Sequence, residues 1–565
     1  MIRALAAGDA AVLLELPSGV GDPAVSPARL ADAIRGAGLP GLAEVIPGAR
    51  TVLVTIEPGS FADTGELARR LLGVRVGDQQ PDEAGQVTQI DVCYDGPDLA
   101  DVARLTGLTV REVIARHEAA EYRVGWLGFS PGFGYLTGLD PALSQVPRLD
   151  SPRLAVPAGS VAIAGGLAAV YPAASPGGWR LLGRTGARLW DPARQPPALL
   201  APGMRVRFRA ARALSGEPSA RRAQPSRADA DSQPAGQAAD RGVLVVQPGP
   251  LTTVQDRGRG GLGHLGVPAS GAADPASLRR ANALVGNEPG AACLEVTLGR
   301  LALRFSADAV VAVTGAPAPA RLVAADGTVL ADTDGGAAPE RQATSVLAVP
   351  AGAVLRLGAP ATGLRSYLAV DGGFDVAPVL GSRSADLLSG LGPAPLRAGD
   401  WLPLGPASNA GTPQRGGPAP ASTAGTPQRG GPAANAGSEY GPGTLVELRA
   451  IAGPRADWFG AAALQALATA GYEVTPASNR TGLRLAGPPL RRARPGELPS
   501  EGVAAGSLQV THDGQPILLL ADHPTTGGYP VIAVVRTADI GRAAQLRPGQ
   551  RIRFRLDVSA FSPGQ

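Results

Sequence analysis

The chain of 565 residues contains no lysine, so all 52 of its basic residues are arginine. A GC-rich coding bias is the simplest cause, but the chemical consequences hold whatever the cause. Without lysine, the chain has no residue to carry biotin, to form a Schiff base or to complete a P-loop. Any phosphate or carboxylate bound here must therefore be held by arginine, backbone N–H groups or hydroxyls.

Cysteines and long apolar runs are also scarce. Cys93 and Cys293 are the two cysteines, and their spacing is not that of metal ligands, so we predict no metal site and a reduced, cytoplasmic protein. No run of about 18 apolar residues predicts a membrane span, and the N-terminal residues lack a signal-peptide pattern. The net charge of +4 without a basic cluster argues against nucleic acid as a partner.

The abundant residues indicate a β-rich protein. Hydrophobic residues make up 44% of the chain, which is enough for real cores, and many of the 77 glycines and 54 prolines stand between short apolar runs. Alternating patterns such as Val206-Arg207-Phe208 are typical of half-buried strands. We therefore expect a mainly β fold of barrel modules with a few packed helices.

Three short motifs occur twice, in the same order, near the end of each half of the chain. The first copy comprises Ala158-Gly159-Ser160, Gly177-Gly178-Trp179 and Pro202-Gly203-Met204-Arg205-Val206-Arg207-Phe208. The second comprises Ala505-Gly506-Ser507, Gly527-Gly528-Tyr529 and Pro548-Gly549-Gln550-Arg551-Ile552-Arg553-Phe554. This order predicts two related β-modules in a fusion of two proteins, and places function where the halves meet.

Composition divides the chain into four domains and two linkers. Polar, aperiodic residues predict a linker over 211–241, and a direct duplication of Ala-Gly-Thr-Pro-Gln-Arg-Gly-Gly-Pro predicts a low-complexity linker over 406–442. The expected domains are a small N-terminal α/β subdomain (1–83), a barrel (84–210), a β-rich domain (242–405) and a second barrel (443–560).

Helix signals are few. Asp98 and the capping box Thr109-x-x-Glu112 predict two short helices that end near Tyr122. Asp274-Pro275 predicts a helix that Gly286 stops, and the pattern over 457–470 predicts a helix closed by a glycine.

Several motifs of the first half resemble the allophanate-hydrolase-subunit-1 family, which includes the B subunit of bacterial ATP-dependent 5-oxoprolinase. They are Gly128-Phe129-Ser130-Pro131-Gly132-Phe133-Gly134-Tyr135-Leu136, Val156-Pro157-Ala158-Gly159-Ser160 and Ser175-Pro176-Gly177-Gly178-Trp179. The second half resembles the companion subunit-2 family, which includes the C subunit of the same enzyme. Its motifs include Gly249-Pro250-Leu251-Thr252-Thr253-Val254-Gln255-Asp256-Arg257-Gly258-Arg259, Gly381-Ser382-Arg383-Ser384 and Thr525-Thr526-Gly527-Gly528-Tyr529-Pro530.

The resemblance implies cyclophilin-like β-barrels and an ATP-dependent 5-oxoprolinase that is completed by a separate A-type subunit. Such an enzyme opens 5-oxoproline to L-glutamate, with ATP and Mg²⁺ activating the unreactive lactam. Relatives also form the carboxyltransferase part of urea carboxylase, which here would need a biotin carrier on another chain. Others are an inhibitor of a sporulation histidine kinase and its antagonist, and fold alone does not choose among these. Homo-oligomerisation also stays open.

The chemistry needs groups for phosphate, for the substrate carboxylate and for activating water. Arginines and polar residues of the second half are the candidates for binding, together with Arg184 of the first half; a structural role is the competing interpretation for each of them. The binding candidates are Arg257, Arg259, Arg184, Thr525, Gly527, Gly528, Asn282 and Glu295. The catalytic candidates are His523 as base, Asp256, Thr526 and Tyr529.

Other histidines and two departures from the family pattern complete these expectations. His264 could reach the same site, whereas His512 and His117 are expected at the surface. Leu167 and Ala168 stand where the first family commonly has Gln-Thr, which puts the activity in question if that pair touches substrate or partner. The loop at 392–394 is shorter than in the second family.

Overall fold

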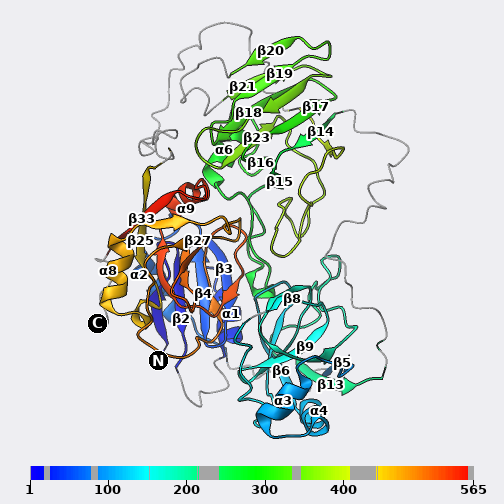
Figure 1. Ribbon diagram of the computed structural model, residues 1–565, viewed down its shortest axis with the longest axis vertical. Coiled ribbons are helices and arrows are strands. Elements are labelled where there is room, and N and C mark those ends of the chain that lie inside the picture. Colours follow the sequence, from blue (N-terminus) through cyan, green and yellow to red (C-terminus); the bar gives the residue numbers. More distant parts are fainter. Residues whose placement is uncertain are drawn as a thin grey trace.

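A computed structural model describes residues 2–17, 26–77, 87–151, 153–212, 214, 241–333, 345–407, 441 and 443–557. The two expected linkers lie almost entirely outside the described residues. Strands dominate the ribbon, and the helices sit on the outside of the sheets (Figure 1). The expectation of a mainly β fold with barrel modules and a small N-terminal α/β subdomain is confirmed. In the described part of the chain, no helix has the length and hydropathy of a membrane span.

The N-terminal subdomain is a four-stranded sheet with the order β1-β2-β4-β3, covered by two helices. Its elements are β1 (Arg3–Ala6), β2 (Ala11–Glu15), α1 (Pro27–Gly36), β3 (Leu42–Pro47), β4 (Thr51–Ile56) and α2 (Thr64–Leu72). Neither helix was predicted from the sequence, although Ser26 and Asp63 cap them by accepting backbone N–H groups. The helices bury one face of the sheet, and the other face is left for a neighbouring domain.

The first barrel has seven strands in the order β12-β9-β10-β7-β6-β13-β5. Its elements are β5 (Val87–Val92), α3 (Leu99–Thr106), α4 (Val110–Ala119), β6 (Tyr122–Leu127), β7 (Gly134–Thr137), β8 (Arg153–Val156), β9 (Ser160–Ala164), β10 (Leu167–Val170), β11 (Ser175–Gly177), β12 (Arg180–Arg184) and β13 (Arg205–Ala210). Both predicted helices are present, and Thr109 and Glu112 form the full capping box. A bridge between Cys93 and Arg184 joins the two edge strands and closes the barrel.

The domain after the first linker packs two sheets face to face around the largest apolar cluster of the described residues. Its elements are β14 (Gly242–Pro248), β15 (Leu251–Gln255), η1 (Gly263–Leu265), α6 (Pro275–Leu284), β16 (Cys293–Thr297), β17 (Leu301–Phe305), β18 (Ala309–Gly315), β19 (Ala320–Val323), β20 (Val329–Asp332), β21 (Ser345–Val349), β22 (Val354–Leu357), β23 (Arg365–Val370) and β24 (Trp401–Pro403). The predicted helix after Asp274 is α6, and Asp274 caps it by accepting the N–H of Ser277.

The second barrel repeats the first strand for strand. Its elements are β25 (Leu445–Ala452), η2 (Ala456–Trp458), α8 (Ala461–Thr469), β26 (Tyr472–Val474), β27 (Gly482–Ala486), β28 (Glu501–Gly502), β29 (Ser507–Val510), β30 (Pro516–Leu519), β31 (Thr526–Gly527), β32 (Val531–Val535), α9 (Thr537–Ala544) and β33 (Arg551–Asp557). The order β32-β29-β30-β27-β26-β33-β25 corresponds to the order of the first barrel, including the parallel pair of first and last strands. The repeated motifs fall at equivalent places in the two barrels.

One predicted helix start is wrong. The helix expected from residue 457 begins only at Ala461, because Phe459 is extended and buried in the barrel core. The residues before it form the short turn η2 instead. Helix α9 was not predicted.

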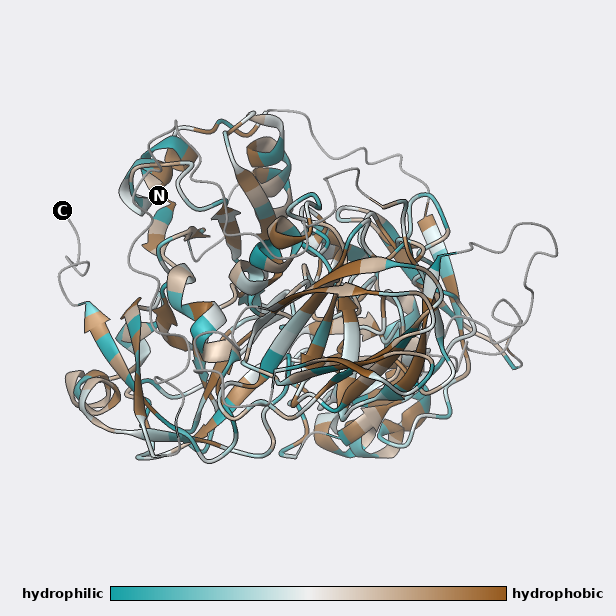
Figure 2. Cartoon of the chain, turned by 90° about the horizontal axis from the view of Figure 1, so that it is seen from above, coloured by the Kyte–Doolittle hydropathy of each residue, from teal (hydrophilic) through white to brown (hydrophobic). Residues whose placement is uncertain are grey.

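The N-terminal subdomain packs against the second barrel rather than standing apart with its own half (Figure 1). Arg455 of that barrel donates to Glu15 at 2.8 Å, and the backbone N–H of Ala49 donates to Ser500 at 2.8 Å. The open face of the N-terminal sheet contributes Leu13 to this interface. Apolar residues gather inside the domains, as the hydropathy colouring shows (Figure 2). The two halves of the chain are therefore interleaved.

Candidate functional site

A cavity of about 310 Å³ lies between the two barrels, and we call it the inter-barrel cavity. Both repeated Gly-Gly loops line it, Gly177-Gly178-Trp179 from the first barrel and Gly527-Gly528-Tyr529 from the second. Each loop begins on a short strand, β11 or β31, that pairs with an equivalent strand, β8 or β28. The duplicated element thus meets its own copy at one site.

The first barrel contributes the loop between β6 and β7 to this site. The backbone N–H of Phe129 donates to Thr526 Oγ1 at 2.9 Å. A Cβ atom on Gly128 would lie 2.5 Å from the same oxygen, so only glycine allows this approach. Behind the loop, the rings of Phe133, Tyr135 and Trp179 pack edge to face with centroids 5.0 to 5.9 Å apart. These aromatic rings form a rigid wall of the cavity.

The second barrel contributes the Gly-Gly loop that the sequence singled out. Neither Gly527 nor Gly528 has a positive φ, so the corner does not need glycine for its backbone angles. A Cβ atom on Gly527 would lie 2.5 Å from the Nε2 of Gln509, and that amide also donates to the carbonyl of Tyr529 at 3.3 Å. The glycine therefore leaves room for the Gln509 amide beside the loop. The ring of His512, expected to be solvated, lies 5.5 Å from that of Tyr529 and lines the cavity.

Two arginines missed by the sequence reasoning line the cavity. Arg148 follows β7 and Arg492 follows β27, so the two lie on equivalent loops of the two barrels. Arg148 Nε lies 3.5 Å from a carboxylate oxygen of the exposed Glu497. Arg492 donates to the carbonyl of Val510 at 2.7 Å, while its buried Nε has no partner. Burial lowers the pKa of Arg492 below its usual value. The cavity can therefore offer guanidinium N–H groups to a small anion.

Tyrosine hydroxyls supply further donors. Burial raises the pKa of Tyr171 to about 12 and also raises the pKa of Tyr135, so both phenols stay protonated at neutral pH. The hydroxyl of Ser500 lies 3.5 Å from that of Tyr135. The inter-barrel cavity therefore places arginine and tyrosine hydrogen-bond donors beside an aromatic wall.

The structure places the predicted residues of the Gly-Gly loop in two different cavities. Thr526, Gly527, Gly528 and Tyr529 line the inter-barrel cavity. Thr525 and His523 instead line a second cavity that lies at the N-terminal subdomain. The hypothesis that His523 acts as a base beside Thr526 is therefore not supported by the geometry.

The predicted Asp256-to-Arg259 turn does not line the inter-barrel cavity. Asp256 accepts the Ser382 hydroxyl and the backbone N–H of Arg383, each at 2.6 Å. Arg259 is 2% exposed and donates to the carbonyl of Val379 at 3.1 Å. Burial lowers the pKa of Arg259. The turn therefore holds two loops of its own domain together.

Arg257 and Asn282 also make contacts within that domain. Arg257 packs across Gly290, where a Cβ atom would lie 2.4 Å from its Nε. Asn282 is fully buried and donates to the carbonyl of Ala291 at 2.8 Å. Both contacts stabilise the loop that precedes β16.

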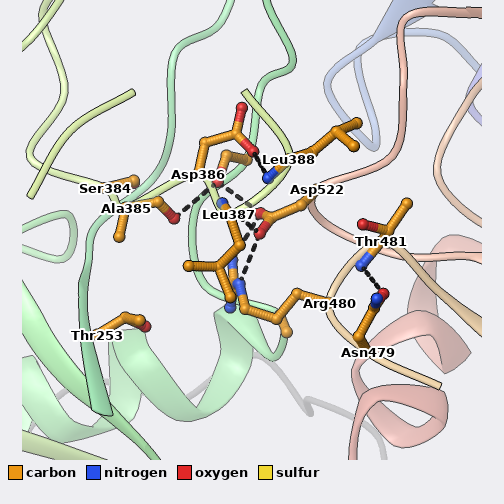
Figure 3. Close-up of polar contacts among 12 residues, drawn as sticks. Thr253, Ser384, Ala385, Asp386, Leu387, Leu388, Asn479, Arg480, Thr481 and Asp522 are labelled. Atoms are coloured by element: carbon orange, nitrogen blue, oxygen red, sulfur yellow. Dashed lines mark hydrogen bonds and ion pairs between the residues drawn. The ribbon is translucent and has the colours of Figure 1, made fainter. Parts of the chain in front are cut away.

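Glu295 belongs to a buried charge cluster that joins the β-rich domain to the second barrel. Arg480 donates to Glu295. Its Nε and Nη2 also donate to Asp522, both at 2.9 Å (Figure 3). Tyr367 also donates to Glu295, at 2.7 Å. Although burial raises the pKa of Glu295, the two neighbouring arginines outweigh it and the pKa is lowered. Asp522 lies four residues before Thr526, so this cluster fixes the start of the Gly-Gly loop.

Arg184 and the remaining histidines lie away from the inter-barrel cavity. Arg184 is exposed on the outside of the first barrel and pairs with Asp95 at 2.8 Å. His117, expected at the surface, is fully buried on the inner face of α4, and burial lowers its pKa to about 3. His264 contacts the carbonyl of Gly261 at 3.0 Å in the η1 turn.

Leu167 and Ala168, which differ from the Gln-Thr pair of the first family, lie beside the candidate site and not in it. Ala168 is buried in the barrel core, and Leu167 packs against the aromatic cluster behind the cavity. Neither residue lines the inter-barrel cavity. Their replacement therefore leaves the cavity-lining groups in place.

Two family models cover most of the chain. The model described as carboxyltransferase domain, subdomain C and D, matches residues 2–200, and that described as carboxyltransferase domain, subdomain A and B, matches residues 265–556. The fold compares well with the crystal structure of TTHA0988, with a TM-score of 0.77, 35% identity, and coverage of 98% of this chain and all of that one.

Among curated proteins, each half of the chain has its own relatives. Over 315 residues the chain is 39% identical to the C subunit of 5-oxoprolinase from Escherichia coli K12, covering 55% of this chain and 90% of that protein. Over 211 residues it is 41% identical to the B subunit of 5-oxoprolinase from Escherichia coli O157:H7, covering 36% of this chain and 92% of that protein. Urea amidolyase of Saccharomyces cerevisiae is 30% identical over 330 residues, 55% of this chain but 16% of that protein. The chain belongs to the carboxyltransferase-domain family, as a fusion of one half similar to the B subunit of 5-oxoprolinase with one half similar to the C subunit.

Proposed function

We propose that this chain is the fused B and C component of an ATP-dependent 5-oxoprolinase, which opens 5-oxoproline to L-glutamate together with a separate A-type subunit. One observation carries the proposal: the inter-barrel cavity is built from both halves, and each half is similar to a different subunit of that enzyme. A site shared by two subunits explains why fusing them is compatible with function.

The cavity groups have distinct roles in this proposal. Arg148 and Arg492 hold the substrate carboxylate, and the aromatic wall packs against the ring. Thr526 Oγ1 accepts the N–H of Phe129, and the Thr526 side chain also hydrogen-bonds to the Tyr135 hydroxyl. In this proposal the Thr526 O–H turns from Tyr135 to donate to the lactam oxygen. A donor aimed at that oxygen stabilises the negative charge that develops when the amide is attacked.

A cavity of about 740 Å³ lies where α6 and α9 begin, and it is a candidate site for the activating nucleotide. Helix N-termini bind phosphate through free N–H groups, but here carboxylates already occupy them. Asp274 accepts the N–H of Ser277 at 3.2 Å, and Asp9 accepts that of Thr537 at 3.0 Å. These carboxylates do not fit the phosphates of ATP, so we assign ATP and Mg²⁺ to the A-type subunit.

A second candidate is a urea-carboxylase-like carboxyltransferase. Similarity to urea amidolyase and to the carboxyltransferase-domain models favours it. Because the chain has no lysine, biotin would have to arrive on another protein. This hypothesis predicts carboxyl transfer from a biotinylated carrier and no glutamate from 5-oxoproline. The third hypothesis, a regulator of a sensor kinase, predicts neither activity.

The test is glutamate formation from 5-oxoproline and ATP, by the purified chain alone and with its A-type subunit. We expect glutamate only in the mixture. Arg492→Met should raise KM about tenfold to a hundredfold, since a charge-assisted hydrogen bond contributes about 1.5–3 kcal/mol. The neighbouring exposed Arg491→Met is the matched control and should leave KM unchanged. No glutamate from a folded, associated mixture would refute the proposal.

A further inference from the structure

A second cavity, of about 260 Å³, lies where three domains meet, and we call it the junction cavity. Its walls come from the N-terminal subdomain, from the loop around η1 and from the second barrel. Most of the wall is apolar, with small side chains such as Ala11 and Ala504 beside Ile46 and Val534. Small-molecule sites are usually apolar hollows with a few polar groups, so this cavity is a candidate for a bound ligand.

Two polar groups of the second barrel converge on this apolar space. Thr525 is 2% exposed, lines the cavity and has no hydrogen-bond partner for its Oγ1. His523 Nδ1 lies 2.8 Å from the carbonyl oxygen of Pro524. A carbonyl only accepts, so Nδ1 carries the proton and Nε2 is left as an acceptor. Burial lowers the pKa of His523, which keeps the ring neutral.

The third polar group is Glu44 of the N-terminal subdomain. Its two carboxylate oxygens accept the backbone N–H groups of Gly261 and Gly263, at 2.8 and 2.9 Å. Burial raises the pKa of Glu44 to about 7. No arginine lines the junction cavity among the described residues, and Asp9 at its edge is occupied by Thr537. An anionic ligand would therefore be desolvated without compensation.

We propose that the junction cavity is a second binding site, which takes a small neutral amide or lactam. The amide N–H donates to His523 Nε2, the Thr525 hydroxyl donates to the amide oxygen, and the apolar walls cover the hydrocarbon. This pairing satisfies the orphan hydroxyl and matches the mostly apolar lining. The proposal does not depend on the reaction assigned to the inter-barrel cavity.

The junction cavity and the inter-barrel cavity share one segment of the second barrel in their walls. Thr525 lines the junction cavity and the adjacent Thr526 lines the inter-barrel cavity. A ligand held by Thr525 therefore contacts the segment that carries Thr526. The adjacency also provides two matched isosteric variants, Thr525→Val and Thr526→Val, one for each cavity.

The experiment measures binding of 2-pyrrolidinone, a neutral five-membered lactam, to the full chain by ligand-observed NMR and by crystal soaking. We expect density in the junction cavity and a Kd that Thr525→Val weakens by about tenfold or more. Thr526→Val, the matched control, should leave this Kd unchanged. Ala504→Leu, which fills the cavity without removing a hydrogen bond, should abolish binding.

Two results would overturn the proposal. One is absence of binding to the folded wild-type chain at saturating lactam. The other is binding that Thr526→Val weakens while Thr525→Val and Ala504→Leu do not, because that lactam would lie in the inter-barrel cavity. Thermal unfolding of each variant separates a lost site from a lost fold.

Discussion

In the first barrel, the loop between β6 and β7 carries Gly128 and Phe129, which pack directly on Thr526. In the second barrel, the equivalent loop between β26 and β27 carries Arg480, which is buried against Glu295 of the β-rich domain. One scaffold position thus serves as a wall of the candidate site in one copy and as an interdomain ion pair in the other. Comparing the two loops therefore shows which features both barrels keep and which contacts are particular to one barrel.

The duplication preserves the turns. Gly159 and Gly506 have φ of 79° and 86°, and Gly203 and Gly549 both have φ of 86°. These four glycines adopt left-handed backbone angles that other residues rarely reach. The repeated Ala-Gly-Ser and Pro-Gly motifs therefore belong to the barrel scaffold, whereas the repeated Gly-Gly loops line the inter-barrel cavity.

The largest effect is expected when the ion pair in the second barrel is broken. Arg480→Met should lower the free energy of unfolding by about 3–5 kcal/mol, because Glu295 and Asp522 would stay buried without their partner. Urea denaturation measures this loss. Arg484→Met, four residues away on an exposed position, is the matched control and should change stability by about 0.5 kcal/mol or less.

If Arg480→Met lowered the free energy of unfolding only slightly, the ion pair of the second barrel would not be the main difference between the two loops. Such a result would mean that the neighbouring Arg365, whose Nε lies 3.3 Å from Glu295, compensates that carboxylate alone. The double variant with Glu295→Gln distinguishes this case, because coupling between the two positions would then vanish.

The next effect concerns Glu44, whose contacts hold the loop around η1 against the N-terminal subdomain. Burial raises the pKa of Glu44 from 4.5 to about 7, so the folded protein binds this proton more tightly than the unfolded chain does. Stability from this group is full below about pH 4.5 and falls by about 3 kcal/mol as pH rises to about 7. The free energy of unfolding, measured at pH 5 and pH 8, should fall by this amount in the wild type. The same fall should be absent in Glu44→Gln. Exposed Glu57→Gln should retain it.

Much of the scaffold could be predicted from the sequence because its signals are local. The capping box at Thr109, the Asp274 cap and the repeated β13 and β33 motifs each act within a few residues. Helices α1, α2 and α9 were missed, and α8 was started too early, because Phe459 is held extended by the barrel core. Tertiary packing overrides local propensity at such positions.

The candidate site was predicted only in part. Thr526 and Tyr529 were found because glycines mark their loop, but Arg148 and Arg492 have no local signature. Their shared position appears only when the strands of the two barrels are aligned. Charged residues such as Glu295 and Arg259 looked functional because they stand in apolar or glycine-rich segments, yet each is held by contacts within or between domains.

The smallest effect is expected where the first barrel closes. The second barrel joins β25 to β32 through three residue pairs. The first closes through one bridge between Cys93 and Arg184, followed by backbone hydrogen bonds from Gly96 and Asp98 to β12. That bridge is made by backbone atoms, with N–H···O distances of 2.8 and 2.9 Å, so Arg184→Ala should keep it. The lost ion pair with Asp95 is exposed to solvent, so urea denaturation should show little or no loss of stability. Gly183→Ala is the contrasting variant, because its Cβ would lie 2.3 Å from the Cys93 carbonyl oxygen and force the strands apart. If Arg184→Ala instead abolished glutamate formation with stability intact, Arg184 would belong to a functional surface and the closure of the two barrels would differ in more than strand pairing.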